Sequence, residues 1–318
     1  MMRTDYHADV VIVGSGPGGA TLAKQLSKNG LKVILLEKGA DHRGKWYYGT
    51  HVGAMKYTDK MGLYFTKQGL NVIRPIMTGG ATNLYCGTSA KPPAWLLEKY
   101  HIDLEPYITQ TIDELSIDTL PESHCGKVSL DVMEAGRSLG YDWQLQTKFL
   151  SLKRAIKFNC GAHCMLGCRC HAKWTANEYM DKAIAEGAQL FKNANATSII
   201  FKDNTAIGIQ AIVNGNEDAD FFGKTIIISA GGIGTPLLLQ RSGISEAGKG
   251  VAMDVTTKVY GIWDREGNYQ DPPMTVSYSD DSIGCMFSTL IDPWLLYPII
   301  MSTKGLKYTL HWKDYHKT

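Results

Sequence analysis

The sequence lacks an excess of charge of either sign. Its 318 residues include 33 lysines and arginines against 31 aspartates and glutamates, which gives a net charge of +2. Such a balance creates no strong field over the whole molecule, and this argues against binding to nucleic acid or to an anionic membrane surface. Internal repeats and low-complexity tracts are also absent, and at about 150 residues per domain the length suggests two globular domains.

A secretory leader and a membrane span are missing as well. The polar residues 4–7 follow the N-terminal Met1-Met2-Arg3, where a signal peptide would have its apolar region. The most hydrophobic stretch, residues 283–301, is interrupted by Asp292 and two prolines, which disfavours a transmembrane helix. The seven cysteines are an odd number, and four of them lie within eleven residues, a pattern that suits a reducing compartment better than a secreted disulfide framework. We therefore expect a cytoplasmic protein without a transmembrane segment.

Glycine, in contrast, is abundant, and its 33 copies gather in three clusters. The first, Gly14-Ser15-Gly16-Pro17-Gly18-Gly19, follows an apolar run at 8–13 and opens a helical segment that Asn29-Gly30 closes. A second apolar run spans 31–36, so the segment predicts a strand–helix–strand unit. In this G-x-G-x-x-G pattern, Gly14 permits a tight turn, Gly16 lets the backbone approach a pyrophosphate, and Gly19 lets helix and strand pack closely.

An acidic residue ends the second predicted strand. Glu37 lies 23 residues after Gly14, where its carboxylate could accept hydrogen bonds from a ribose diol and would repel a 2′-phosphate. We expect Ser15, Gly18 and Lys38 to complete this dinucleotide site. The motif alone leaves NAD and FAD as alternatives.

Two further glycine-rich segments favour a flavin. Residues 74–88 contain Gly79-Gly80-Ala81-Thr82-Asn83, a loop of small residues that could lie against a broad isoalloxazine ring, although an ordinary surface loop has the same composition. Residues 228–244 form another strand–glycine–helix junction around Ala230 and Gly231. This junction is either a return of the chain to the cofactor or a tight turn.

Together, these three segments resemble the glucose–methanol–choline (GMC) family of FAD-dependent oxidoreductases over residues 8–250. Residues 79–83 resemble the family's first signature and residues 235–244 the second, while Gly232 and Ser245 depart from the usual pattern. The resemblance implies FAD as cofactor and hydride transfer from the CH–OH group of an alcohol to flavin N5. It also implies that Gly79, Gly80, Ala81, Thr82 and Asn83 lie by the flavin ring, and that the backbone of Ala196 meets adenine.

The fold expected from these observations is α/β. The resemblance implies a discontinuous Rossmann-like FAD-binding domain with a parallel sheet, at 1–92 and 160–248, and an incomplete α+β substrate domain at 93–159 and 249–318. In the first domain we expect strands at 189–192, 207–213 and 225–229. One helix should follow a Thr175–Glu178 capping box and end at Gly187, and another should start at Thr235-Pro236 and end at Gly243. Segment 93–158 shows mostly helical or loop patterns.

The cysteine loop leaves three alternatives. Cys160, Cys164, Cys168 and Cys170 could converge on an iron–sulfur cluster, or cysteines and histidines of this loop could bind zinc. The third alternative is a structural loop or a disulfide without metal. This alternative follows from a resemblance, because the cysteine loop is similar to loops of long-chain alcohol oxidases in the family.

A catalytic base is not visible. The resemblance implies a histidine near the C-terminus of the family's longer chains, and neither His311 nor His316 has the matching context. The expectation is a truncated member with unknown catalytic residues, acting on a small-molecule alcohol. The apolar run 294–300 and the resemblance of the cysteine loop to long-chain alcohol oxidases suggest a hydrophobic alcohol. Its partners would be an electron-acceptor protein or the missing C-terminal segment. The alternatives are a non-catalytic or partner-completed flavoprotein and, less favoured, an NAD-dependent dehydrogenase.

Overall fold

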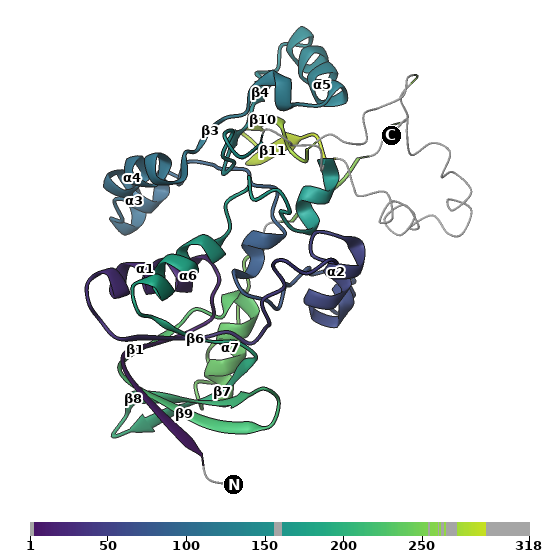
Figure 1. Cartoon of the computed structure of the whole chain (residues 1–318). Coiled ribbons are helices and arrows are strands. Elements are labelled where there is room, and N and C mark those ends of the chain that lie inside the picture. Colours follow the sequence, from purple (N-terminus) through teal and green to yellow (C-terminus); the bar gives the residue numbers. More distant parts are fainter. Residues whose placement is uncertain are drawn as a thin grey trace. The chain divides into compact units, whose positions relative to one another are not determined.

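The computed structural model describes residues 3–155, 161–253, 255–259, 261, 264 and 272–290 (Figure 1). The chain divides into two compact units. Unit 1 comprises Met1–Tyr48, Val52–Asn83 and Thr175–Thr256, and unit 2 comprises Gly49–His51, Leu84–Trp174 and Thr257–Thr318.

These boundaries differ from the expected domain limits, because residues 84–92 and the cysteine loop belong to unit 2. Local pairing explains the difference: Phe149 N donates to Gly87 O (2.7 Å), and the Tyr85 hydroxyl donates to Trp174 O (2.9 Å). The assignment of the units to cofactor and substrate remains a prediction.

Unit 1 is built on a six-stranded sheet in the order β6-β2-β1-β9-β8-β7. Its strands are β1 (Thr4–Val13), β2 (Val33–Leu36), β6 (Gln189–Phe191), β7 (Ala194–Lys202), β8 (Thr205–Val213) and β9 (Glu217–Ile228). Strands β6, β2, β1 and β9 pair in parallel, whereas β7, β8 and β9 form an antiparallel meander. The predicted α/β fold is therefore confirmed, and the described sheet is mixed rather than wholly parallel.

The predicted strand–helix–strand unit is confirmed at β1, α1 (Pro17–Lys28) and β2. The last four residues of β1 and all four of β2 are buried, as expected for parallel strands covered on both faces. Gly19 allows the close packing of helix on strand, since a Cβ at this position would lie 1.9 Å from Gly14 O. Gly30, with φ of +79°, follows the helix where the sequence predicted its end.

Helix α6 (Ala176–Ala185) packs against α1, and the two lie side by side in Figure 1. Thr175 precedes α6 as predicted, but its side chain makes no capping hydrogen bond, so the predicted capping box is wrong. The Thr175 hydroxyl instead accepts a hydrogen bond from the Asn177 side chain, whose Nδ2 lies 3.4 Å away.

Two further expectations for unit 1 are corrected. Helix α7 (Gly231–Arg241) begins four residues before the predicted cap Thr235, and Pro236 lies inside it. Pro236 is the sixth residue of α7, beyond the four N–H groups that lack an intrahelical acceptor, so it removes one hydrogen bond from this helix. Strand β7 was not predicted, since its residues 195–198 are small and mostly polar and a register shift interrupts its pairing between Ala196 and Ser198.

The core of unit 1 lies between the sheet and its helices. Phe221 is fully buried, and its ring stacks on Tyr6 at 4.9 Å between centroids. Phe191 meets Tyr6 edge-on at 4.7 Å. These contacts join β9, β1 and β6 within the core of unit 1.

Unit 2 combines helices with short strands, in agreement with the α+β class expected for it. Its helices include α3 (Trp95–Tyr100), α4 (Glu105–Leu115) and α5 (Lys127–Ser138). One small sheet contains β4 (Gln144–Leu145), β10 (Val276–Asp280) and β11 (Cys285–Ser288), and another pairs β3 (Asp118–Thr119) with β5 (Thr147–Lys148). Helix α2 (His51–Tyr57) begins at the boundary between the units. Within the described part of the chain, no helix is both long and apolar enough to cross a membrane.

Candidate functional site

The three glycine loops meet in unit 1. Gly79 N donates a hydrogen bond to Ser15 Oγ (3.2 Å), which joins the second loop to the first. A Cβ on Gly80 would lie 3.0 Å from Gly16 Cα, and a Cβ on Gly14 would lie 2.3 Å from Ser229 O at the start of the third loop. Of the two alternatives for the third segment, the structure therefore shows a return of the chain to the first loop, and glycine permits this close approach of the three backbones.

A cavity of about 630 Å³ opens beside this junction. Most of the predicted cofactor-binding residues line it, namely Gly14, Gly16, Gly18, Glu37, Lys38, Gly80, Ala81, Ala196, Ala230 and Gly231. At Gly16, Gly231 and Gly232 a Cβ would find no described heavy atom within 4 Å, so a side chain at any of these positions would project into open space. A group bound there could approach the backbone closely.

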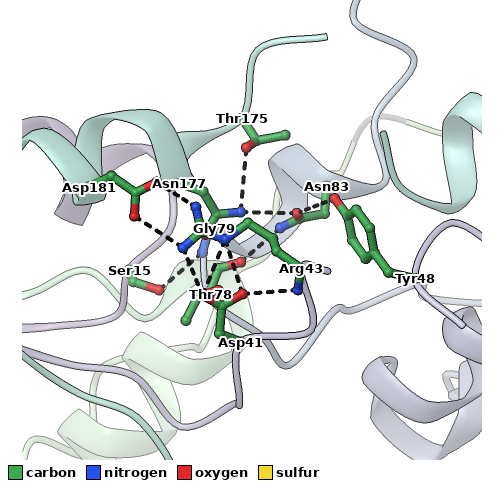
Figure 2. A network of polar contacts seen from close by, with 10 residues as sticks. All are labelled: Ser15, Asp41, Arg43, Tyr48, Thr78, Gly79, Asn83, Thr175, Asn177 and Asp181. Atoms are coloured by element: carbon green, nitrogen blue, oxygen red, sulfur yellow. Dashed lines mark hydrogen bonds and ion pairs between the residues drawn. The ribbon is translucent and has the colours of Figure 1, made fainter. Parts of the chain in front are cut away.

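The remaining five predicted residues do not line the cavity. They are Ser15, Gly19, Gly79, Thr82 and Asn83. The Asn83 amide donates from Nδ2 to Thr78 O and Gly80 O, both at 2.9 Å. Its Oδ1 accepts from the Tyr48 hydroxyl (3.0 Å) and from Asn177 Nδ2 (3.2 Å), as Figure 2 shows. These contacts hold the second loop in shape.

Thr82 supports the same loop from the other side. Its hydroxyl donates to Gly79 O (2.6 Å) and accepts from Ala176 N (2.9 Å) at the first turn of α6. The loop 79–83 is therefore attached to α6 through the buried side chains of Thr82 and Asn83, which an ordinary surface loop would expose.

Two helices begin at the cavity. Helix α1 starts after Gly16 and α7 after Ala230, and neither has a side chain that caps its first turn. The first N–H groups of a helix have no intrahelical acceptor, and the helix dipole adds positive potential at the same end. Paired helix N-termini of this kind suit an anionic group such as a diphosphate.

Basic side chains add to this potential. Lys38, Arg74 and Arg241 line the cavity, and Arg74 also forms an ion pair with Asp59 (3.2 Å). The sequence prediction missed Arg74 and Arg241 as site residues, although Arg74 begins the second glycine segment and Arg241 lies in the third.

The one carboxylate among the lining residues belongs to Glu37, at the end of β2. It is buried, and its Oε2 accepts hydrogen bonds from Ser15 N (3.1 Å) and from the Ser15 hydroxyl (2.6 Å). Its Oε1 accepts from Gly39 N (2.8 Å). Burial raises the pKa of Glu37 above its ordinary value, and these hydrogen bonds act against that rise.

A surface ion pair holds the segment after β2. The Arg43 guanidinium bridges Asp41 (2.7 Å) and Asp181 on α6 (2.5 Å), as Figure 2 shows. The hydrogen bonds that Arg43 donates to the Asp41 and Asp181 carboxylates raise the pKa of Arg43 above its ordinary value. This network fixes the chain beyond Lys38 against the helix layer.

The cysteine loop shows no metal site within the described residues. Cys168 Sγ lies 3.8 Å from Cys170 Sγ and accepts a hydrogen bond from Lys173 N (3.3 Å). The neighbouring Cys170 thiol and burial together raise the pKa of the Cys168 thiol. In the described ranges, no three histidine, cysteine or acidic side chains are placed to hold a metal ion. Cys160 lies outside the described residues.

Unit 2 contains a feature that the sequence did not reveal. Lys148 is almost fully buried, and its ammonium donates to Cys86 O (3.2 Å), Thr88 Oγ1 (3.0 Å) and Pro273 O (2.9 Å). Burial lowers the pKa of Lys148 to about 8. Lysine is rarely buried, so composition and periodicity carry no signal for such a position.

The fold and the glycine loops define a Rossmann-like dinucleotide-binding protein. In agreement with this class, the sequence model of the NAD(P)-binding Rossmann-like domain matches residues 12–74. The sequence model of GMC oxidoreductase matches residues 93–259, which is more than half of the chain. The chain belongs to the GMC oxidoreductase family.

Individual relatives agree with this assignment. An uncharacterized GMC-type oxidoreductase of Mycobacterium tuberculosis is 25% identical over 81% of this chain and 43% of the relative. A long-chain-alcohol oxidase of Arabidopsis thaliana is 28% identical over 74% of this chain and 34% of the relative. The chain therefore spans less than half the length of these two relatives.

Solved structures show the same fold. Formate oxidase of Aspergillus oryzae has a TM-score of 0.55 at 18% identity, over 76% of this chain and 48% of that chain. Pyridoxine 4-oxidase from Mesorbium loti has a TM-score of 0.54 at 17% identity, over 74% of this chain and 52% of that chain.

Proposed function

We propose that unit 1 binds FAD in the cavity between its three glycine loops. The observation that carries this proposal is the junction itself, where Gly79 N reaches Ser15 Oγ at 3.2 Å beside a cavity of about 630 Å³. A site for a nucleotide alone would need one glycine loop. FAD can use the first loop for its pyrophosphate and the second for its isoalloxazine ring. FAD modification is described for the related formate oxidase, which agrees with this cofactor.

The residues present fit such a group. The open backbone at Gly16 and the N-termini of α1 and α7 would hold the pyrophosphate, and Arg74 and Arg241 would offset its negative charge. Glu37 Oε1 would accept a hydrogen bond from the ribose, and Ala196 would lie at the adenine. Gly80 and Ala81 would lie against the isoalloxazine ring.

For the whole protein we propose an FAD-dependent oxidoreductase that acts on the CH–OH group of an alcohol. Bound FAD supplies a hydride acceptor, and this chain's contribution is to hold that acceptor against the glycine backbone that lines the cavity. The support is family membership together with relatives named long-chain-alcohol oxidases and 2-methyl-1,2-propanediol dehydrogenase. A hydrophobic alcohol is the proposed substrate class.

Anaerobic reduction tests this proposal. The purified chain, loaded with FAD, is mixed with primary alcohols of increasing length, and the loss of the flavin's visible absorption is followed. Bleaching that becomes faster as the alcohol becomes longer supports a hydrophobic alcohol as substrate. 2-Methyl-1,2-propanediol serves as a short polar alcohol, and bleaching by this diol alone contradicts the proposed substrate class. If FAD binds but no alcohol bleaches it, the partner-completed flavoprotein becomes the favoured function, and addition of candidate partners provides its test.

A further inference from the structure

The side chain of Ser15 joins three separate parts of the proposed cofactor site. It is completely buried, and its hydroxyl donates to Glu37 Oε2 (2.6 Å) while it accepts from Gly79 N (3.2 Å). A serine hydroxyl has a single hydrogen to donate, so the backbone N–H of Gly79 must be the donor in the second contact. The direction of both hydrogen bonds is therefore defined by the chemistry of the groups.

The Glu37 carboxylate is largely committed to the protein. Besides the Ser15 hydroxyl, it accepts from Ser15 N (3.1 Å) and from Gly39 N (2.8 Å). A carboxylate offers about four acceptor positions, and three of them are filled here. Glu37 consequently acts as an anchor for the first loop and for Ser15, and one acceptor position remains for a ligand.

The contact from Ser15 to Gly79 connects the two halves of the site. The first loop and Glu37 form the part proposed for the ADP half of FAD, and the second loop forms the part proposed for its ring half. Asn83 and Thr82 stabilise the second loop internally and against α6. The hydrogen bond from Gly79 N to Ser15 Oγ joins this loop to the first one.

We propose that Ser15 is a positioning residue that aligns the second glycine loop with the first, and thereby sets the binding of the ring half of the cofactor. The inference rests on the proposed binding of FAD. This positioning role makes a different prediction from a role in fold stability alone. Loss of alignment should weaken the binding of FAD, which spans both loops, more than the binding of ADP, which occupies only the first.

Ser15→Ala provides the test, with Ser27→Ala as its matched control. Ser27 lies on the same helix that follows the first loop, is 4% exposed, and its hydroxyl has no hydrogen-bond partner among the described residues. The affinities of the wild type and both variants for FAD and for ADP are measured by titration. We expect Ser15→Ala to raise the Kd for FAD about tenfold or more, because the second loop loses its contact with the first. The Kd for ADP should rise much less, because Ser15 N and Gly39 N still hold the Glu37 carboxylate in place.

The control should change neither affinity. Equal weakening of FAD and ADP by Ser15→Ala, or no weakening of either, would overturn the positioning role while leaving FAD binding intact. Failure of the wild type to bind FAD would overturn the proposed function, and this inference with it. The two failures are therefore distinguishable.

A measurement on the wild type covers the case in which Ser15→Ala does not fold. Hydrogen exchange of the Gly79 amide is followed at single-residue resolution in the cofactor-free protein. The proposal predicts protection of this amide, because its hydrogen is bonded to a buried oxygen. Exchange at the rate of an unprotected amide would contradict it.

Discussion

At the scale of single residues, two glycines of the first loop have opposite surroundings although only Ser15 separates them. Gly14 has φ of +100°, and a Cβ there would lie 2.3 Å from Ser229 O. Gly16 has extended backbone angles, and a Cβ there would meet nothing within 4 Å. Gly14 is thus required by the fold, and Gly16 by whatever enters the cavity.

Alanine substitutions separate these two roles. We expect Gly14→Ala to lower the free energy of unfolding by about 2 kcal/mol or more, because it adds both a steric overlap and a strained backbone. Gly16→Ala should leave the free energy of unfolding unchanged or raise it by about 0.4–1 kcal/mol, because its backbone suits alanine. Urea denaturation of the ligand-free protein checks both values, and equal destabilisation by the two variants would be the contrary result.

Lys148 makes a prediction about pH. In the folded protein its pKa is lowered to about 8, whereas an exposed lysine keeps its proton up to about pH 10.5. Between these values the unfolded chain binds more protons than the folded one, so the contribution of this group to the free energy of unfolding rises with pH from about 8 to about 10.5. Below about pH 8 both states are protonated, and the contribution is at its least favourable.

Lys148→Met tests that pH dependence. Denaturation of the wild type and the variant at several pH values gives the difference in their free energies of unfolding. The difference should move in favour of the wild type as the pH rises through this window. A difference that stays constant, or that moves toward the variant, would contradict the lowered pKa.

At the scale of elements, the parts with strong sequence patterns were predicted and the parts set by tertiary contacts were not. The apolar runs of β1 and β2, with Gly14–Gly19 between them, predicted a strand–helix–strand unit that the structure confirms. Strand β7 was missed because its small polar residues give no strand signal, and pairing with β8 stabilises the strand nonetheless. The start of α7 was placed too late because proline is typical of the first helical position, and Pro236 was assigned to it. The support of the second loop by Asn83 and α6 depends on contacts between distant segments, which one-dimensional patterns do not contain.

The attachment of this loop gives a prediction at the same scale. Asn83→Ala removes four hydrogen bonds that join the loop to itself, to Tyr48 and to Asn177. We expect a loss of about 2–4 kcal/mol in the free energy of unfolding, since the partners are buried and remain unsatisfied. The exposed turn residue Asn216 offers a control, and Asn216→Ala should be nearly neutral. A loss no larger than that of the control would show that the Asn83 contacts add little.

At the scale of the whole molecule, the sequence indicated the family and the convergence of its glycine loops, and it did not reveal the basic lining at Arg74 and Arg241 or the buried Lys148. Isolated basic residues are common on surfaces, so only the folded cavity gives them a shared role. Four features of the sequence fall outside the described residues: the candidate metal ligand Cys160, the histidines His311 and His316, and the apolar run 294–300. The assignment of CH–OH oxidation to this chain accordingly depends on its family, and the proposal of FAD binding depends on the cavity.

The binding of FAD by the purified chain is the most direct test of the central claim. Titration followed by flavin fluorescence should show one saturable site that ADP displaces competitively. Gly16→Val, which projects a branched side chain into the cavity, should abolish that binding while the protein stays folded. Absence of saturable FAD binding by the wild type, or unchanged FAD binding by Gly16→Val, would contradict the assignment of this cavity.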